Sequence, residues 1–239
     1  QVDILEGLGF ETGTDDNIIT AAVPPWRPDV HGEPDLVEEI TRIHGFDEIA
    51  PVSLDRDTAL PPAAITPAQL RTSRVRRALA AQGLDEAVTW SFMGRAHAEL
   101  FADDADAMDG LMLANPISSE LDAMRPSILG NLLLAAGRNA DRGFADLGLF
   151  ELGPAYRDAS PDGQLLVAAG VRHGNAHPAH WSGAARAADA LDAKADALAG
   201  LDAAGAPTAN LQVSRDVPAW YHPGRSGGLR LGKNVLAWF

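Results

Sequence analysis

Asp29, Asp35, Glu38 and Glu39 lie close together in the stretch "RPDVHGEPDLVEEITRIHG", residues 27–45. An α-helix turns about 100° per residue, which would place Glu38 and Glu39 each within roughly 60° of Asp35 on one side of the helix. Asp29 lies six residues before Asp35, and a turn between them would bring it back towards the same face. Oxygen ligands suit a hard cation such as Mg²⁺ or Ca²⁺. These four acids are therefore candidate metal ligands.

The same acids also fit a solvated helix surface. Acidic side chains in the first turn of a helix are favoured by the helix dipole, and Glu38 or Glu39 could pair with Arg42. The apolar residues would then form the packed side of the helix, namely Leu36, Val37, Ile40 and Ile43. Spacing alone favours this solvated surface and leaves the metal site open.

Two other groups of reactive side chains form no convincing catalytic set. His173, His177 and His180 lie close together in "HGNAHPAH", but no nearby acid completes a ligand set, which favours a loop. Ser118 and Ser119 have no histidine nearby in the sequence, so nucleophilic catalysis is poorly supported.

Composition narrows the class of protein. The 239 residues are 46% hydrophobic, which is enough for one large domain or two unequal ones, and cysteine is absent, which excludes disulfides and thiolate metal sites. The chain has no run of 18 apolar residues and begins without the features of a signal peptide, so we expect a cytoplasmic protein without a membrane partner. A net charge of −14 opposes a general phosphate-binding surface.

A local cluster of arginines stands out against this acidic background. It consists of Arg71, Arg74, Arg76 and Arg77. These arginines would spread around their helix, which favours a solvated face or a subunit contact over binding of nucleic-acid phosphate.

The elements that would position these residues fall on either side of a proline-containing linker at 51–66. Before it, the patterns predict a short helix ending at Gly9, a strand ending at Pro24, and a helix over 34–44. After it, they predict helices over 67–83, in "SILGNLLLAAGRNA" and in "ADALDAKADALAGLDAAG". Strands are predicted in "EAVTWSFM", "GLMLANP", "DLGLFELG", "QLLVAAGVRHG" and "GGLRLGKNVLAWF". Because several strands follow one another without intervening helices, we expect an α+β fold with an antiparallel sheet.

The segment "VPPWRPDVHGEPDLVEEITRIHGFDEI" is the first of several longer stretches that resemble a known family. It resembles the B5 domain of the beta subunit of bacterial phenylalanine–tRNA ligase. Four further segments resemble the synthetase-like core domain of the same subunit, namely "RVRRALAAQGLDEAVTWSF", "LANPISSELDAMRPSILGNLL", "LGLFELGPAYRD" and "YHPGRSGGLRLGKNVLAWF". The resemblance covers nearly the whole chain and implies a piece of a longer subunit. We expect it to lack the N-terminal tRNA-binding region, the editing domain and the C-terminal anticodon-binding domain.

The resemblance implies a small winged-helix-like B5 domain at residues 1–61 and a class II synthetase-like antiparallel sheet domain with flanking helices at 62–239. It further implies that Asp29, Asp35, Glu38 and Glu39 are ligands of a Mg²⁺ ion shared with the alpha subunit. The implied partners are that alpha subunit, within an (αβ)₂ heterotetramer, and phenylalanine tRNA through the full assembly.

In such a ligase the alpha subunit joins phenylalanine to its tRNA with ATP and Mg²⁺, and the beta core is non-catalytic. The segment "HPGRSGGLRLG" agrees, because it does not have the Gly-x-Gly-x-x-x-Arg order of class II active sites. A free-standing winged-helix-type nucleic-acid-binding module is the main alternative, although the charge opposes it. A metal-dependent hydrolase built on the carboxylates is a third and weaker hypothesis.

Overall fold

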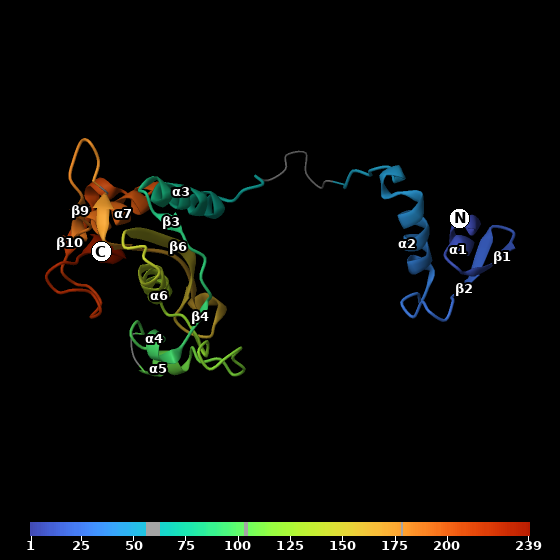
Figure 1. The fold of residues 1–239 in the computed structure, drawn as a ribbon, viewed down its shortest axis with the longest axis horizontal. Coiled ribbons are helices and arrows are strands. Elements are labelled where there is room, and N and C mark those ends of the chain that lie inside the picture. The colour runs from blue at the N-terminus through green and yellow to red at the C-terminus, as the bar shows by residue number, and fades with distance from the viewer. Residues whose placement is uncertain (56–62, 103–104, 178) are drawn as a thin grey trace. The chain divides into compact units, whose positions relative to one another are not determined.

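The computed structural model describes residues 1–55, 63–102, 105–177 and 179–239 (Figure 1). The chain forms two compact units, Gln1–Pro62 and Ala63–Phe239, which we call unit 1 and unit 2. The domain boundary that the sequence predicts between residues 61 and 62 lies outside the described residues.

Unit 1 is built from helices and one β-hairpin. Its described elements are α1 (Val2–Gly7), β1 (Glu11–Asp15), β2 (Ile18–Ala22), α2 (Glu33–His44) and the 3₁₀-helix η1 (Phe46–Glu48). The two strands pair antiparallel, with Glu11 opposite Ala22. The sequence predicted both helices and the second strand. It missed the first strand, because "ETGTD" has no alternation of apolar residues.

Glycines end both helices of unit 1 in conformations that other residues rarely adopt. Gly9 follows α1 with φ of 90°, and Gly45 follows α2 with φ of 116°. A Cβ atom at Gly9 would also lie 2.9 Å from the ring of Trp26, so another residue there would have a strained backbone and would have to displace that ring. The buried core of the unit consists of Leu5, Phe10 and Val30, against which α2 packs Leu36 and Ile40.

Unit 2 is a mixed assembly of helices and small sheets. Its helical elements are α3 (Pro67–Ala81), α4 (Arg95–Ala98), α5 (Ala105–Asp109), α6 (Ile128–Asp141), η2 (Pro161–Gly163), α7 (Ala190–Ala203) and η3 (Thr208–Asn210). Its strands are β3 (Asp85–Glu86), β4 (Phe92–Met93), β5 (Ala123–Met124), β6 (Leu147–Tyr156), β7 (Gln164–His173), β8 (Asn175–His177), β9 (Arg186–Ala187), β10 (Gln212–Ser214), β11 (Gly228–Leu231) and β12 (Asn234–Trp238). The α+β class that the sequence predicted is confirmed, because unit 2 contains both helices and strands.

The main sheet of unit 2 has the strand order β3-β6-β7. Strands β6 and β7 pair antiparallel over ten residues each, from Leu147 opposite His173 to Tyr156 opposite Gln164, whereas β3 joins β6 in parallel. Helix α6 packs against β6 and β7, and α3 packs against α7. Phe150 of β6 is fully buried in a cluster with Val75, Leu79 and Leu84.

Two predicted strands are shorter than expected. In "EAVTWSFM" only the two ends pair, as β3 and β4, and residues 87–91 lie outside any strand. In "GLMLANP" the structure has a single bridge, between Met112 and Ala123. Met93 and Leu111 belong to a buried cluster, whereas Val88 and Trp90 are exposed. The apolar alternation of these segments therefore does not correspond to one buried face of a strand.

No helix in the described part of the chain is both long and apolar enough to cross a membrane.

Candidate functional site

Asp35 lies in the first turn of α2, and its side chain caps the N-terminal end of the helix. Its Oδ2 atom accepts hydrogen bonds from the backbone N–H groups of His31 (2.7 Å) and Gly32 (3.0 Å). Such bonds satisfy donors that precede the helix and favour the ionised carboxylate. They hold the pKa of Asp35 below its usual value.

Glu39 lies one turn further along α2 and is buried, contrary to the exposed position that the sequence predicted. Its Oε2 atom accepts hydrogen bonds from Arg27 Nη1 at 3.0 Å and from Arg42 Nη2 at 2.9 Å. These two guanidinium groups, Arg27 foremost, lower the pKa of Glu39 to about 2. The predicted alternative, a pair between Glu39 and Arg42, is therefore present.

Asp29 belongs to the segment before α2 and also binds Arg27. Arg27 donates from Nε to Asp29 Oδ1 at 3.0 Å and from Nη2 to Asp29 Oδ2 at 2.7 Å, so the pair is bidentate. The contact with Arg27 lowers the pKa of Asp29 to about 2. In turn, its hydrogen bonds to Asp29 and Glu39 raise the pKa of Arg27.

The four predicted ligands are thus shared out among different partners. Arg27 brings Asp29 and Glu39 together, Asp35 binds backbone N–H groups, and Glu38 is exposed. Among the residues that the structure describes, no group of three or more Asp, Glu or His side chains could hold a metal ion. In this arrangement the carboxylates do not fit a Mg²⁺ ion, and the Mg²⁺ site stays a prediction.

A buried polar network in unit 2 was not predicted. Arg125 donates to Glu151 Oε1 (2.9 Å), to Thr89 Oγ1 (2.9 Å) and to the carbonyl oxygen of Pro154 (2.8 Å). Thr89 Oγ1 in turn donates to Glu151 Oε2 at 2.6 Å. The network ties residues 87–91 and the segment before α6 to β6. One signal could have indicated it, namely a glutamate within the apolar run of "GLFELG".

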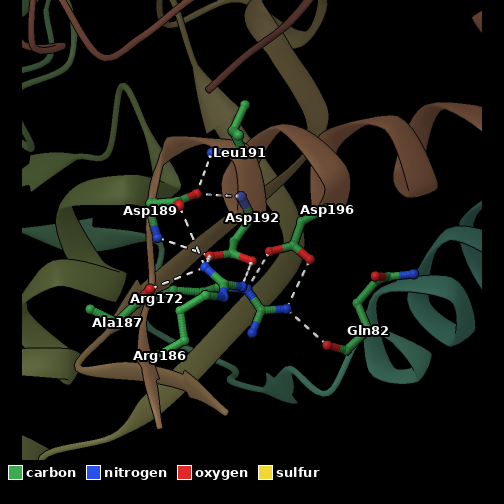
Figure 2. Close-up of polar contacts among 8 residues, drawn as sticks. All are labelled: Gln82, Arg172, Arg186, Ala187, Asp189, Leu191, Asp192 and Asp196. Atoms are coloured by element: carbon green, nitrogen blue, oxygen red, sulfur yellow. Dashed lines mark hydrogen bonds and ion pairs between the residues drawn. The ribbon is translucent and has the colours of Figure 1, made fainter. Parts of the chain in front are cut away.

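A second network joins β7, α7 and the end of α3 (Figure 2). Arg172 of β7 donates to both carboxylate oxygens of Asp196, at 2.6 and 2.9 Å, and to the carbonyl oxygen of Gln82 at 2.8 Å. Beside it, Arg186 binds Asp192 in a bidentate pair at 2.6 and 2.9 Å. The hydrogen bond from Arg186 lowers the pKa of Asp192 to about 2. These pairs fix the packing of helices on the sheet.

The loop that the sequence favoured for the histidine group is wrong, because His173 is the last residue of β7, His177 is the last residue of β8 and His180 forms a bridge with Gly183. His173 Nδ1 lies 2.8 Å from the carbonyl oxygen of Ala145, and His180 Nδ1 lies 2.8 Å from Ser182 Oγ. In the arginine cluster, Arg76 pairs with Glu86 at 2.6 Å.

Comparison with known proteins shows which family the chain belongs to. The profile of the phenylalanyl tRNA synthetase beta chain CLM domain matches residues 56–239. The chain belongs to this family. The profile of the tRNA synthetase B5 domain matches residues 1–46, and the resemblance seen in the sequence is thereby confirmed.

Relatives named phenylalanine–tRNA ligase beta subunit are similar over almost the whole chain. The one from Rhodospirillum rubrum is 59% identical over 90% of this chain and 26% of its own length. The one from Paramagnetospirillum magneticum is 51% identical over 99% of this chain and 29% of its own length. The chain therefore spans less than a third of the length of these relatives. A solved pyrrolysyl tRNA synthetase from Desulfitobacterium hafniense has a TM-score of 0.49 at 17% identity, over 70% of this chain and 56% of that chain.

Proposed function

We propose that this chain is a non-catalytic part of a phenylalanine–tRNA ligase beta subunit that assembles with the alpha subunit and supports its active site. The family match over residues 56–239 carries the proposal, and the names of the relatives support it. The intact enzyme would be an (αβ)₂ heterotetramer in the cytoplasm that uses ATP and Mg²⁺ to join phenylalanine to its tRNA. We assign residues 1–61 to a B5 domain of winged-helix type and residues 62–239 to a class II synthetase-like core.

One arginine of unit 2, Arg125, is not available to bind ATP. An adenylate-forming site needs arginines that can reach the triphosphate of ATP. Arg125 is 1% exposed and its guanidinium group binds Glu151, Thr89 and the carbonyl oxygen of Pro154. This arginine is therefore engaged in holding the fold together.

An assay of the chain with and without the alpha subunit tests this role. We expect no pyrophosphate exchange that depends on phenylalanine when the chain is incubated alone with phenylalanine, ATP and Mg²⁺. The proposal would be contradicted by exchange activity of the chain alone, provided that the activity persists after removal of contaminating host synthetase by a second affinity step.

The four acids of unit 1 keep their place in the proposal as predicted Mg²⁺ ligands near the alpha subunit. Their present contacts set a condition for this role, because Asp29 and Glu39 are both bound by Arg27. A metal ion could use these two carboxylates only in a different arrangement of Arg27.

A further inference from the structure

A groove of about 600 Å³ in unit 1 is lined by residues of α1, the β1–β2 hairpin and α2. We call it the α2 groove. The buried side chains of Leu5 and Val30 belong to its lining, and α2 contributes Leu36 and Ile40. Its volume falls within the range of natural ligand sites, about 300–1,000 Å³. The α2 groove is therefore large enough to receive several side chains of a partner.

Apolar side chains at the α2 groove remain exposed to solvent. Ile18 of β2 is 67% exposed and Val37 of α2 is 54% exposed, and both line the groove. Their neighbours Ile19 and Leu36 pack against the core of unit 1, so Ile18 and Val37 are held on rigid elements. Exposed apolar side chains around a hollow are typical of a surface that another polypeptide covers.

Unit 1 carries most of the negative charge of the protein. Residues 1–55 contain 13 Asp and Glu side chains and two Arg side chains, which gives a formal charge of −11, compared with −14 for the whole chain. Both arginines are bound to carboxylates within the unit, Arg27 to Asp29 and Arg42 to Glu39. The field of the unit therefore attracts a cationic partner and repels an anionic one such as nucleic acid.

Two acidic side chains lie at the α2 groove itself. Glu33, in the first turn of α2, is part of its lining. Asp15 of β1 pairs with Ile18 of β2, and paired residues of antiparallel strands have their side chains on the same face. Both acids are exposed, and within the described residues neither carboxylate has a hydrogen bond or an ion pair. They are free to meet cationic side chains of a partner.

We propose that the α2 groove is a docking site for a basic amphipathic segment of a partner protein. Apolar side chains of that segment enter the groove and cover Ile18 and Val37, while its lysines or arginines meet Asp15 and Glu33. The combination of an apolar hollow and an acidic border selects this class of partner. The inference rests on unit 1 alone and is independent of the proposed function.

The test measures binding of a short synthetic amphipathic peptide of leucine and lysine to the whole chain at low salt, through the fluorescence anisotropy of a label on the peptide. Two matched peptides separate the contributions. One has glutamate in place of lysine, and the other has serine in place of leucine. We expect each of them to bind at least about tenfold more weakly than the leucine–lysine peptide.

Substitutions at the exposed apolar side chains locate the site. Val37→Gln and Ile18→Thr should each weaken binding of the leucine–lysine peptide by about tenfold, because each removes apolar surface that the peptide covers. Val88→Gln is the matched control, since Val88 is 90% exposed and belongs to unit 2. It should change the dissociation constant less than about twofold.

Substitutions of the acids test the charge contribution. Asp15→Asn together with Glu33→Gln should weaken binding at least about threefold at low salt and less at high salt, because salt screens exposed charges. Glu120→Gln together with Asp141→Asn is the matched control, since both of these exposed acids belong to unit 2. This control should change the dissociation constant less than about twofold.

Three results would overturn the proposal. Binding that is unchanged by both Val37→Gln and Ile18→Thr would place the peptide elsewhere. Equal binding of the serine peptide would show that the acidic surface alone holds it, and equal binding of the glutamate peptide would show that charge does not select the partner. The unchanged chain covers the case in which a variant fails to fold. Its amide resonances at residues 18–23 and 30–40 should shift when the leucine–lysine peptide binds, and shifts confined to unit 2 would refute the site.

Discussion

Arg125 and Glu151 form an ion pair of 2.9 Å in the interior of unit 2, where their side chains are 1% and 4% exposed. The two residues come from the segment before α6 and from the middle of β6. Thr89 contacts both of them, so three separate parts of the chain meet at this pair. We therefore regard it as the polar centre of unit 2.

Breaking this pair should destabilise unit 2 strongly. Removing one partner leaves the other as an uncompensated buried charge, which costs about 3–5 kcal/mol. We expect Arg125→Met and Glu151→Leu each to lower the free energy of unfolding by that amount. Urea-induced unfolding followed by tryptophan fluorescence measures the change.

The double variant separates lost charge balance from lost packing. With both charges removed, no ion is left unpaired, so Arg125→Met with Glu151→Leu should be more stable than either single variant. Single-variant losses that simply add in the double variant would show that the two residues do not act as a pair.

Gly153 should be required beside this network. A Cβ atom there would lie 2.6 Å from Arg125 Nη2 and 3.0 Å from Glu151 Oε1. Gly153→Ala should therefore cost about 1–3 kcal/mol of stability. Gly137→Ala is the matched control, because Gly137 lies within α6 with no other atom within 4 Å of its added Cβ. That substitution should stabilise the helix by about 0.5–1 kcal/mol, and equal effects at the two sites would contradict the described packing.

Asp192 should make stability depend on pH at the acid end. Its pKa is lowered from 3.8 to about 2 by Arg186, so the folded chain binds this proton less readily than the unfolded chain does. The stabilisation is fully present above pH 3.8 and is lost as the pH falls through about 2. We expect Asp192→Asn to be less stable than the unchanged chain at pH 6 and to approach it at pH 2.

Urea-induced unfolding measured at several pH values from 6 to 2 tests this expectation, and Arg186→Gln is the control for Asp192. Without its partner, Asp192 loses the main cause of its low pKa, and the extra loss of stability between pH 3.8 and 2 should shrink. If the difference in the free energy of unfolding between Asp192→Asn and the unchanged chain stays constant from pH 6 to 2, the lowered pKa of Asp192 is refuted as the cause of the pH dependence.

Much of unit 1 could be predicted from local signals. Gly45 and Pro34 mark the ends of α2, and Pro24 follows β2 closely. The burial of Glu39 could not be predicted, because it depends on Arg27, which lies twelve residues away and meets α2 only after the chain turns back. Helical spacing describes the faces of one helix, and it does not show which charged side chain from elsewhere in the chain packs against them.

The polar network of unit 2 illustrates the same limit at longer range. Arg125 and Glu151 are separated by 26 residues, and a single sequence carries no record of their pairing. The strand expected in "GLMLANP" was wrong for a related reason, since apolar content reports burial and does not distinguish a sheet from a packed loop. The long strands β6 and β7 were predicted correctly, because each has a sustained apolar run bounded by turn residues.

Light scattering behind a sizing column tests the central claim most directly. The chain would be mixed with the alpha subunit of a bacterial phenylalanine–tRNA ligase, in Mg²⁺ and again in chelator, with serum albumin in place of the alpha subunit as the control. An assembly role predicts a peak whose mass exceeds that of either component and contains both of them. Separate elution of the two proteins in both buffers would contradict the account.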